Sequence, residues 1–178
     1  MPLPKGQYLV KDFIDITIEN NDKKFDNLVV IVKDKQKIFD YSELIALMDT
    51  KLSLDMHCVD GWSVQNNTFE GVSLKKISEI VNVKDFEYIG LESIGGYKSF
   101  VDKDYALDSF VCLRLNGSAL SKSRGFPMRF IAPKLYAYKW VKHLYKITFT
   151  NKKPYGYWED RGYSARARVE FQERFKED

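Results

Sequence analysis

Residues 51–58 carry the pattern that most constrains how this chain can fold. Apolar residues at 52, 54 and 56 alternate with polar residues at 53, 55 and 57. A period of two places the apolar positions on one face, which predicts a half-buried strand. Cys58 continues the apolar face, so its sulfur should point inward where the strand meets Asp60 and Gly61. A soft, ionisable sulfur at such a place can bind a metal, but a buried free cysteine that packs as a small hydrophobe fits the same pattern.

The remaining sequence predicts several further strands and few helices. Asp40 followed by Glu43 predicts a capped helix start, and Ser73 predicts a second one before an apolar face. Asn116-Gly117 is a strong signal for a two-residue hairpin. Strands are predicted at 28–32, 86–91, 110–115, 128–132 and 144–150, a short helix at 102–107, a turn at 94–97, and loops at 62–67 and 133–142. Because strands outnumber helices and do not alternate regularly with them, we predict an α+β fold with a mixed-sheet core, in one domain over residues 1–178.

Composition narrows the class of protein without identifying a function. A length of 178 residues, with 44% hydrophobic and 30% charged residues, is ordinary for one soluble domain. No apolar run is long enough for a transmembrane helix, the N-terminus lacks a signal core, and a net charge of +3 indicates neither nucleic acid nor membrane. We therefore expect a cytoplasmic protein. With two cysteines and two histidines, neither a disulfide framework nor a zinc or His-rich metal site is expected.

A second informative stretch gathers basic and aromatic residues between positions 116 and 142. Arg129, Lys139 and Lys142 lie near one loop that is rich in aromatic side chains. Three cations can neutralise a phosphate dianion, and an arginine offers a fork of hydrogen-bond donors. The stretch therefore predicts a phosphate-binding loop, with a solvated basic loop that binds no ligand as the alternative.

These stretches resemble those of the sulfite-oxidase-like, molybdopterin-dependent oxidoreductases. The segment Asp55–Ser63 is similar to the family segment whose cysteine is the thiolate ligand to molybdenum, which implies this role for Cys58. The pattern from 116 to 142 is similar to the family's loop for the pterin phosphate. Leu3–Gln7 and Gly156–Tyr163 resemble segments near the two ends of the family domain, so the likeness covers nearly the whole chain.

The resemblance implies particular cofactor contacts for the basic loop. Arg129, Lys139 and Lys142 would bind the pterin phosphate. Trp140 stands where the family usually has a serine, so its backbone N–H would replace the missing hydroxyl as a donor. His57 corresponds to a histidine near the pterin, and a hydrogen bond across the sheet is an equal alternative for it.

Ser93 and Tyr97, which follow the predicted strand at 86–91, complete the implied site. By its spacing from Cys58, this segment resembles the family segment with a hydroxyl residue on the cofactor and an active-site tyrosine. Ser93 would contact the pterin, and Tyr97 would hydrogen-bond an oxo group or the substrate at the metal. A tyrosine packed in a turn is the alternative for Tyr97.

The implied function is oxygen-atom transfer to or from a small oxyanion or S-oxide, such as sulfite or a sulfoxide. The cofactor would be molybdopterin with molybdenum, or with tungsten, and Cys58 would be a ligand of the metal. The sequence has no haem motif, so we expect a separate electron-transfer partner. The chain is too short for the family's further dimerisation domain, so we expect a monomer without nucleic-acid or membrane partners.

Two other interpretations stay open. Basic and aromatic residues interleave over 155–168, which is also typical of a module that binds nucleotides or single-stranded nucleic acid. Trp140, His143 and Ser164 depart from the family pattern, which is compatible with a homologue that holds the cofactor without catalysis.

Overall fold

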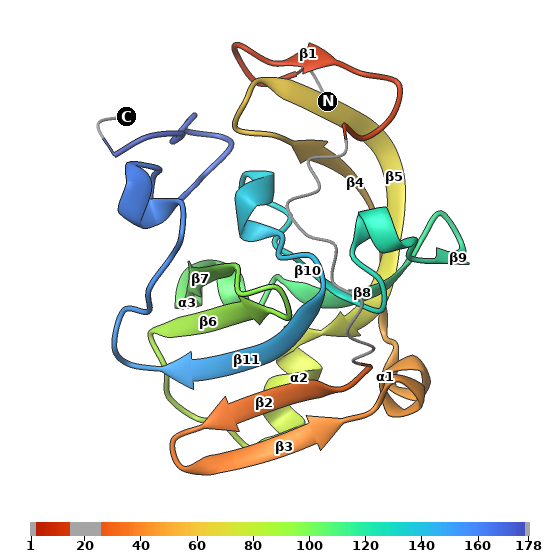
Figure 1. Cartoon of the computed structure of the whole chain (residues 1–178), viewed down its shortest axis with the longest axis vertical. Coiled ribbons are helices and arrows are strands. Elements are labelled where there is room, and N and C mark those ends of the chain that lie inside the picture. The colour runs from red at the N-terminus through yellow and green to blue at the C-terminus, as the bar shows by residue number, and fades with distance from the viewer. Residues whose placement is uncertain (1–2, 15–25, 177–178) are drawn as a thin grey trace.

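The computed structural model describes residues 3–14 and 26–176, and the elements below lie within these residues (Figure 1). The strands are β1 (Tyr8–Leu9), β2 (Leu28–Val32), β3 (Lys35–Phe39), β4 (Thr50–His57), β5 (Trp62–Ser73), β6 (Tyr88–Ser93), β7 (Lys98–Asp102), β8 (Phe110–Leu115), β9 (Ser118–Ala119), β10 (Arg129–Ile131) and β11 (Leu144–Thr150). The α-helices are α1 (Tyr41–Leu47), α2 (Leu74–Ile80) and α3 (Lys103–Ala106), and the 3-10 helices are η1 (Lys122–Arg124), η2 (Ala137–Lys139) and η3 (Glu159–Arg161). No helix among the described residues has both the length and the apolar character needed to cross a membrane.

Two sheets organise the described chain. The first has the order β1-β5-β8-β10, with β4 paired to β5 and β9 paired to β8. In this sheet β1 runs parallel to β5, and the other pairs are antiparallel. The second sheet has the order β3-β2-β11-β6-β7, and its one parallel pair is β2 with β11. Both sheets are mixed and helices are few, which confirms the predicted α+β fold.

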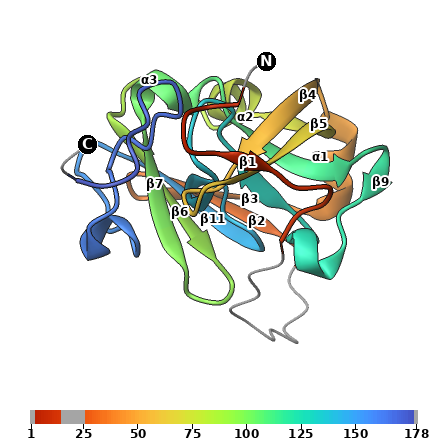
Figure 2. The ribbon, with the colours of Figure 1, turned by 90° about the horizontal axis from the view of Figure 1, so that it is seen from above.

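The long strand β5 determines the shape of the first sheet. Figure 1 shows it curving along one side of the molecule, with β1 and β4 beside its upper part. The view from above shows β1 lying across the end of β5 (Figure 2). The chain after β11 rises on the side opposite β5, so the C-terminal segment faces the Cys58 end of β4 and β5 across the molecule (Figure 1).

The helix starts that the sequence predicts are both present. Asp40 precedes α1, and its carboxylate accepts a hydrogen bond from the Glu43 backbone N–H at 2.8 Å. Ser73 precedes α2, and its hydroxyl accepts one from the Lys76 N–H at 3.1 Å. These bonds satisfy backbone donors that have no partner inside a helix, which is why such residues begin helices. The capping box is incomplete, because the Glu43 side chain accepts a hydrogen bond from Lys37 rather than from the Asp40 backbone N–H.

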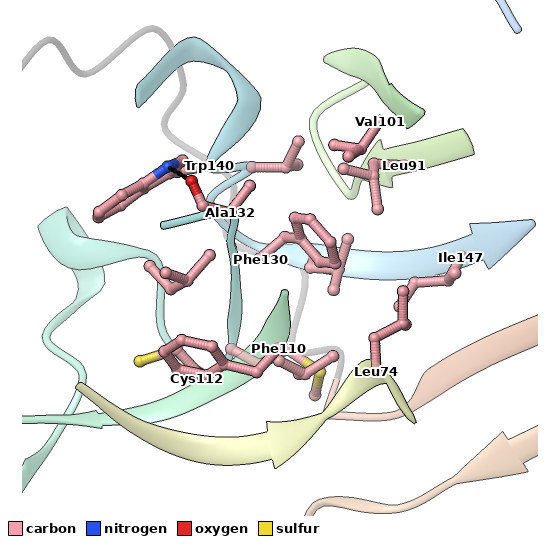
Figure 3. Packing of buried hydrophobic residues seen from close by; sticks show 14 of the residues in the cluster. Leu74, Leu91, Val101, Phe110, Cys112, Phe130, Ala132, Trp140 and Ile147 are labelled. Atoms are coloured by element: carbon pink, nitrogen blue, oxygen red, sulfur yellow. Dashed lines mark hydrogen bonds between the residues drawn. The ribbon is translucent and has the colours of Figure 1, made fainter. Parts of the chain in front are cut away.

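The apolar core joins the two sheets. Phe110 and Phe130 come from the first sheet, Leu91 and Ile147 from the second, and each is at most 1% exposed (Figure 3). Cys112 lies among these side chains with no exposed area, so it packs as a small apolar residue of the core (Figure 3). Burial of this kind is the main favourable contribution to folding, and it fixes the strands that carry the site.

Two local predictions about the cysteine strand and its neighbour are wrong. Residues 62–67 are not a loop but the first half of β5, which pairs with β4 along one edge and with β1 and β8 along the other. Backbone pairing on both edges overrides the polar character of this stretch. Leu52 should be inward-facing but is 38% exposed, because β4 lies at an edge of the sheet, where β5 is its only partner among the described strands. The prediction holds for Met56 and Cys58, which are both buried.

Candidate functional site

A cavity of about 700 Å³ opens between the Cys58 turn, the 93–97 turn, the 124–143 loops and the C-terminal segment. Its size is within the usual range for a small-molecule or cofactor site. Its described lining consists of Phe13, Ile14, Met56, Cys58, Val59, Asp60, Trp62, Ser93, Gly95, Gly96, Tyr97, Arg124, Arg129, Ala137, Tyr138, Trp140, Lys142, His143, Tyr157, Trp158 and Tyr163.

Cys58 lies in the cavity wall directly after β4. Gly61, with a left-handed φ of +102°, reverses the chain and donates its N–H to the Cys58 carbonyl at 3.1 Å. The thiol is 8% exposed and donates a weak hydrogen bond to the Asp60 carboxylate at 3.6 Å. Burial raises the pKa of the Cys58 thiol to about 11, so a metal that binds this sulfur must displace a proton.

Arg129 brings a buried positive charge to the same cavity. Its side chain donates to the Trp140 carbonyl at 3.2 Å and to the Arg124 carbonyl at 3.4 Å, and burial lowers its pKa to about 10. Among the described residues its Nε has no hydrogen-bond partner. A buried, charged donor without a partner is costly, so this atom indicates an anionic ligand.

Lys142 and His143 form a second basic element of the wall, held by the loop after η1. The Lys142 ammonium donates to the Ser123 carbonyl at 2.7 Å, and His143 Nδ1 lies 2.8 Å from the Phe126 carbonyl. Gly125 makes this contact possible, because a Cβ on it would lie 3.0 Å from Lys142 Cα. The glycine also has a left-handed φ of +102°, so a side chain there would be strained.

The structure does not bring Lys139 to the cavity with the other predicted cations. Its ammonium has no exposed area and donates to Glu159 at 2.5 Å and to the Phe100 carbonyl at 2.8 Å. The ammonium is therefore buried and already bonded within the protein, whereas the sequence predicts that it binds the pterin phosphate. The reason is local: the 3-10 helix η2 places residues 138 and 140 toward the cavity and turns residue 139 into the core.

Trp140 lines the cavity, but its donors are already used. Its indole N–H donates to the Ala132 carbonyl at 2.7 Å (Figure 3), and its backbone N–H donates to the Ala137 carbonyl at 3.0 Å. The backbone donor that the sequence offers for a phosphate is therefore engaged within η2. Trp140 instead supplies an apolar surface and orients Arg129 through its carbonyl.

Ser93 and Tyr97 both lie in the wall, as the sequence predicts. Ser93 is buried, and its hydroxyl accepts a hydrogen bond from the Gly95 N–H at 3.3 Å. The Tyr97 hydroxyl donates to the Tyr138 carbonyl at 2.6 Å. Burial, with the nearby Glu159 charge, raises the pKa of Tyr97 well above its ordinary value, so this hydroxyl is neutral.

His57 is not among the residues that line the cavity. Its Nδ1 lies 2.8 Å from the hydroxyl of Ser63, its cross-strand partner on β5. This contact is the hydrogen bond across the sheet, which the sequence offers as the alternative to a position of His57 near the pterin. Burial lowers the pKa of His57, which favours the neutral ring.

The sequence did not assign the aromatic wall opposite Cys58 to the cavity. Trp158 and Tyr163 stack with centroids 4.9 Å apart, and Tyr138 meets Tyr163 edge-on at 5.3 Å. Tyr163 and Cys58 line the same cavity, and burial, with the nearby Asp60 and Cys58, raises the pKa of the Tyr163 hydroxyl. The C-terminal motif was a signal for these residues, but only their return across the molecule brings them to Cys58 (Figure 1).

Basic residues of the 155–168 stretch make contacts within the chain. Arg161 stacks on Tyr157 at 3.7 Å, and Arg168 pairs with Glu173. Both contacts lie inside the C-terminal segment. The Tyr138 hydroxyl, which donates to the Ser164 carbonyl at 2.6 Å, joins this segment to the rest of the domain, where its aromatic residues complete the cavity.

A two-sheet α+β domain whose cavity offers a thiol and several cations fits a protein that holds an anionic cofactor. The sequence model of the family "Oxidoreductase molybdopterin binding domain" matches residues 17–158, and the chain belongs to this family. It is thus an oxidoreductase that binds molybdopterin, as the sequence motifs predict.

Two relatives agree with this assignment, and one solved structure shares the fold. The chain is 32% identical over 136 residues to "Uncharacterized oxidoreductase YuiH" of Bacillus subtilis, covering 75% of this chain and 69% of YuiH. It is 31% identical over 137 residues to "Putative protein-methionine-sulfoxide reductase subunit YedZ1" of Azospira oryzae, covering 75% of this chain and 52% of that protein. The sulfane dehydrogenase SoxCD of Paracoccus pantotrophus has a similar fold, with a TM-score of 0.63 and 18% identity, over 71% of this chain and 38% of the SoxCD chain.

Proposed function

We propose that this protein transfers an oxygen atom to or from a small sulfur compound at a molybdenum, or tungsten, bound by molybdopterin and by Cys58. The observation that carries the proposal is that one cavity of about 700 Å³ is lined by both Cys58 and Arg129, whose Nε has no hydrogen-bond partner within the described part of the chain. A thiolate suits the metal, and a buried guanidinium suits the pterin phosphate.

The residues present fit such a group. The cavity is large enough for a cofactor. Its cations are Arg124 at the end of η1, Arg129 at the start of β10 and Lys142 shortly before β11. When bound, the metal and pterin would supply the two-electron redox change and carry the oxygen atom. The protein would supply position and electrostatics: Arg129 and Lys142 would bind the phosphate, and Cys58 would hold the metal after losing its proton.

The opposite wall would receive the substrate. Tyr97 is held at the cavity by its hydrogen bond to the Tyr138 carbonyl, and its oxygen keeps capacity to accept a second bond. Trp158 and Tyr163 stack in the wall of the cavity that Cys58 also lines, and these rings would help to exclude water from the reacting atoms.

An S-oxide is the substrate class that we favour, and the name of YedZ1 supports it. The chain covers about half of YedZ1, so its substrate and partner remain our proposals. We further propose that a separate protein exchanges electrons with this domain, and that both work in the cytoplasm.

The experiment is to purify the protein from cells that make molybdopterin, and to measure metal, pterin and reduction of methionine sulfoxide with an artificial electron donor. Wild type should contain about one pterin and one metal per chain and should reduce the sulfoxide. Lys142→Ala and Arg129→Gln should each lose most of the pterin, since a charge-assisted hydrogen bond contributes about 1.5–3 kcal/mol.

The matched control is Lys134→Ala, because Lys134 is an exposed lysine paired with Asp108 outside the cavity. It should keep its pterin. Unchanged pterin content in both cavity variants would contradict the proposed phosphate site. Loaded protein that is inactive with sulfoxides and with sulfite would instead identify a homologue that holds the cofactor without this catalysis.

A further inference from the structure

A chain of three polar side chains lies behind Cys58, outside the residues that line the cavity. Gln7, just before β1, donates from its side-chain amide to the Cys58 carbonyl at 2.9 Å. The Ser63 hydroxyl donates to the Gln7 side-chain oxygen at 2.8 Å. The imidazole of His57 completes the chain, with Nδ1 2.8 Å from the Ser63 oxygen. Gln7 precedes β1, Ser63 lies on β5 and His57 ends β4. Among the described residues, these three strands lie side by side only around Ser63.

The hydrogen bonds of this chain have one consistent direction. The Cys58 carbonyl can only accept, so the Gln7 amide nitrogen must face it and the Gln7 oxygen must face Ser63. The single hydrogen of Ser63 then goes to Gln7, so His57 must donate from Nδ1 to the Ser63 oxygen. A His57 ring that carries a proton on Nδ1 completes the chain. Each of the three hydrogen bonds therefore has a fixed donor and a fixed acceptor, and the direction of the chain cannot reverse.

The consequence for Cys58 is a backbone whose hydrogen bonds are all satisfied. Its N–H donates to the Trp62 carbonyl at 2.8 Å, and its carbonyl accepts from both Gly61 and Gln7. Ser63 has no exposed area, so the chain is anchored in the interior. The rotation of the thiol about its own side-chain bond is then the main freedom left to this residue.

We propose that Gln7, Ser63 and His57 are positioning residues that fix where the Cys58 sulfur lies in the cavity, ready for the metal. The inference rests on the proposed function, because it assigns the three residues a role toward a metal ligand. Groups that orient metal ligands typically matter 10- to 100-fold for metal affinity or activity. The backbone pairing of β1 does not explain the Gln7 side chain, since Tyr8 and Val10 already bond to Gly61 and Ser63 through their main chains.

The test is the reactivity of Cys58 in the full chain produced in cells that cannot make molybdopterin. Gln7→Met removes the amide at nearly constant volume and charge. Iodoacetamide modification, followed at Cys58 by peptide mass spectrometry, should be roughly 10-fold faster in this variant, because the turn is no longer fixed. Gln65→Met is the matched control, since Gln65 bonds to Asp55 farther along the same strand pair. It should react like wild type.

Ser63→Ala provides a second variant, which breaks the same chain at its middle and should act in the same direction. In loaded protein, Gln7→Met should keep its pterin while metal retention falls 10- to 100-fold. Wild-type reactivity of Cys58 in both Gln7→Met and Ser63→Ala would overturn the inference. Thiol reactivity is measured without cofactor, so it tests the positioning of Cys58 independently of the proposed function. Wild-type protein that acquires no pterin would instead count against the proposed function.

Discussion

Replacement of Lys139 by methionine tests whether this lysine stabilises the fold, while Arg129 and Lys142 bind the phosphate. The sequence motif assigns Lys139 to the pterin phosphate, but the structure buries its ammonium against Glu159, with both side chains at most 4% exposed. Glu159 also accepts a hydrogen bond from Ser99 at 2.7 Å. Lys139→Met keeps the apolar stem and removes the charge, so Glu159 would stay buried without a cation.

The expected loss of stability is large. Removal of one partner from a buried ion pair costs about 3–5 kcal/mol, because the other charge stays buried without compensation. For a domain of this size each kcal/mol lowers the melting temperature by about 2–4 °C, which gives roughly 6–20 °C for Lys139→Met. The double variant Lys139→Met/Glu159→Gln removes both charges and should recover most of the loss.

Urea denaturation followed by tryptophan fluorescence measures this loss, and pterin content is measured on the folded protein. Lys142→Ala should give the opposite pattern, with little loss of stability and most of the pterin gone. If Lys139→Met is within about 1 kcal/mol of wild type yet lacks pterin, the lysine binds the phosphate and our description of its environment is wrong.

Three further predictions concern stability and assembly. Hydrogen bonds from Arg168 lower the pKa of Glu173, so its stabilising contribution is present above the ordinary value of 4.5 and is lost as pH falls through the lowered pKa. Glu173→Gln should therefore lower the urea midpoint at neutral pH and lose less stability than wild type on acidification; equal pH profiles would contradict this. Gly71→Ala should cost about 3 kcal/mol or more, because its Cβ would lie 1.9 Å from the Val111 carbonyl, and a stable, soluble variant would show that this contact is misplaced. We also predict a monomer, and a dimer that persists on dilution in light scattering would be the contrary result.

Local patterns in the sequence predicted those elements whose residues determine them directly. The Asp40 and Ser73 caps, the strand at 110–115 and the Asn116-Gly117 hairpin all occur where predicted. Each depends on a side chain that bonds to nearby backbone, on a left-handed turn or on a simple apolar run. The strand at 35–39 was not predicted, because its alternation is weak and its place depends on pairing with β2.

The candidate site was predictable where a motif residue also faces the cavity. Cys58, Ser93, Tyr97, Arg129, Trp140 and Lys142 all lie in its wall. Lys139 and His57 share the motifs but point elsewhere, because a 3-10 helix and a cross-strand pair set their directions. Spacing along the chain does not specify the direction of a side chain in an irregular loop. The stacking of Trp158 on Tyr163 depends on a contact across the molecule, which spacing does not specify either.

The central claim is that Cys58 is the protein's ligand to the metal, and metal-edge X-ray absorption on loaded protein tests it most directly. Cys58→Ala should keep the fold, since the void costs about 1 kcal/mol, and should keep the pterin through Arg129 and Lys142. Its spectrum should show one sulfur fewer at the metal, with no oxygen-atom transfer, whereas Cys112→Ala should match wild type because Cys112 is packed in the core. A Cys58→Ala protein with the wild-type sulfur shell and activity, or a sulfur lost in Cys112→Ala instead, would contradict the account.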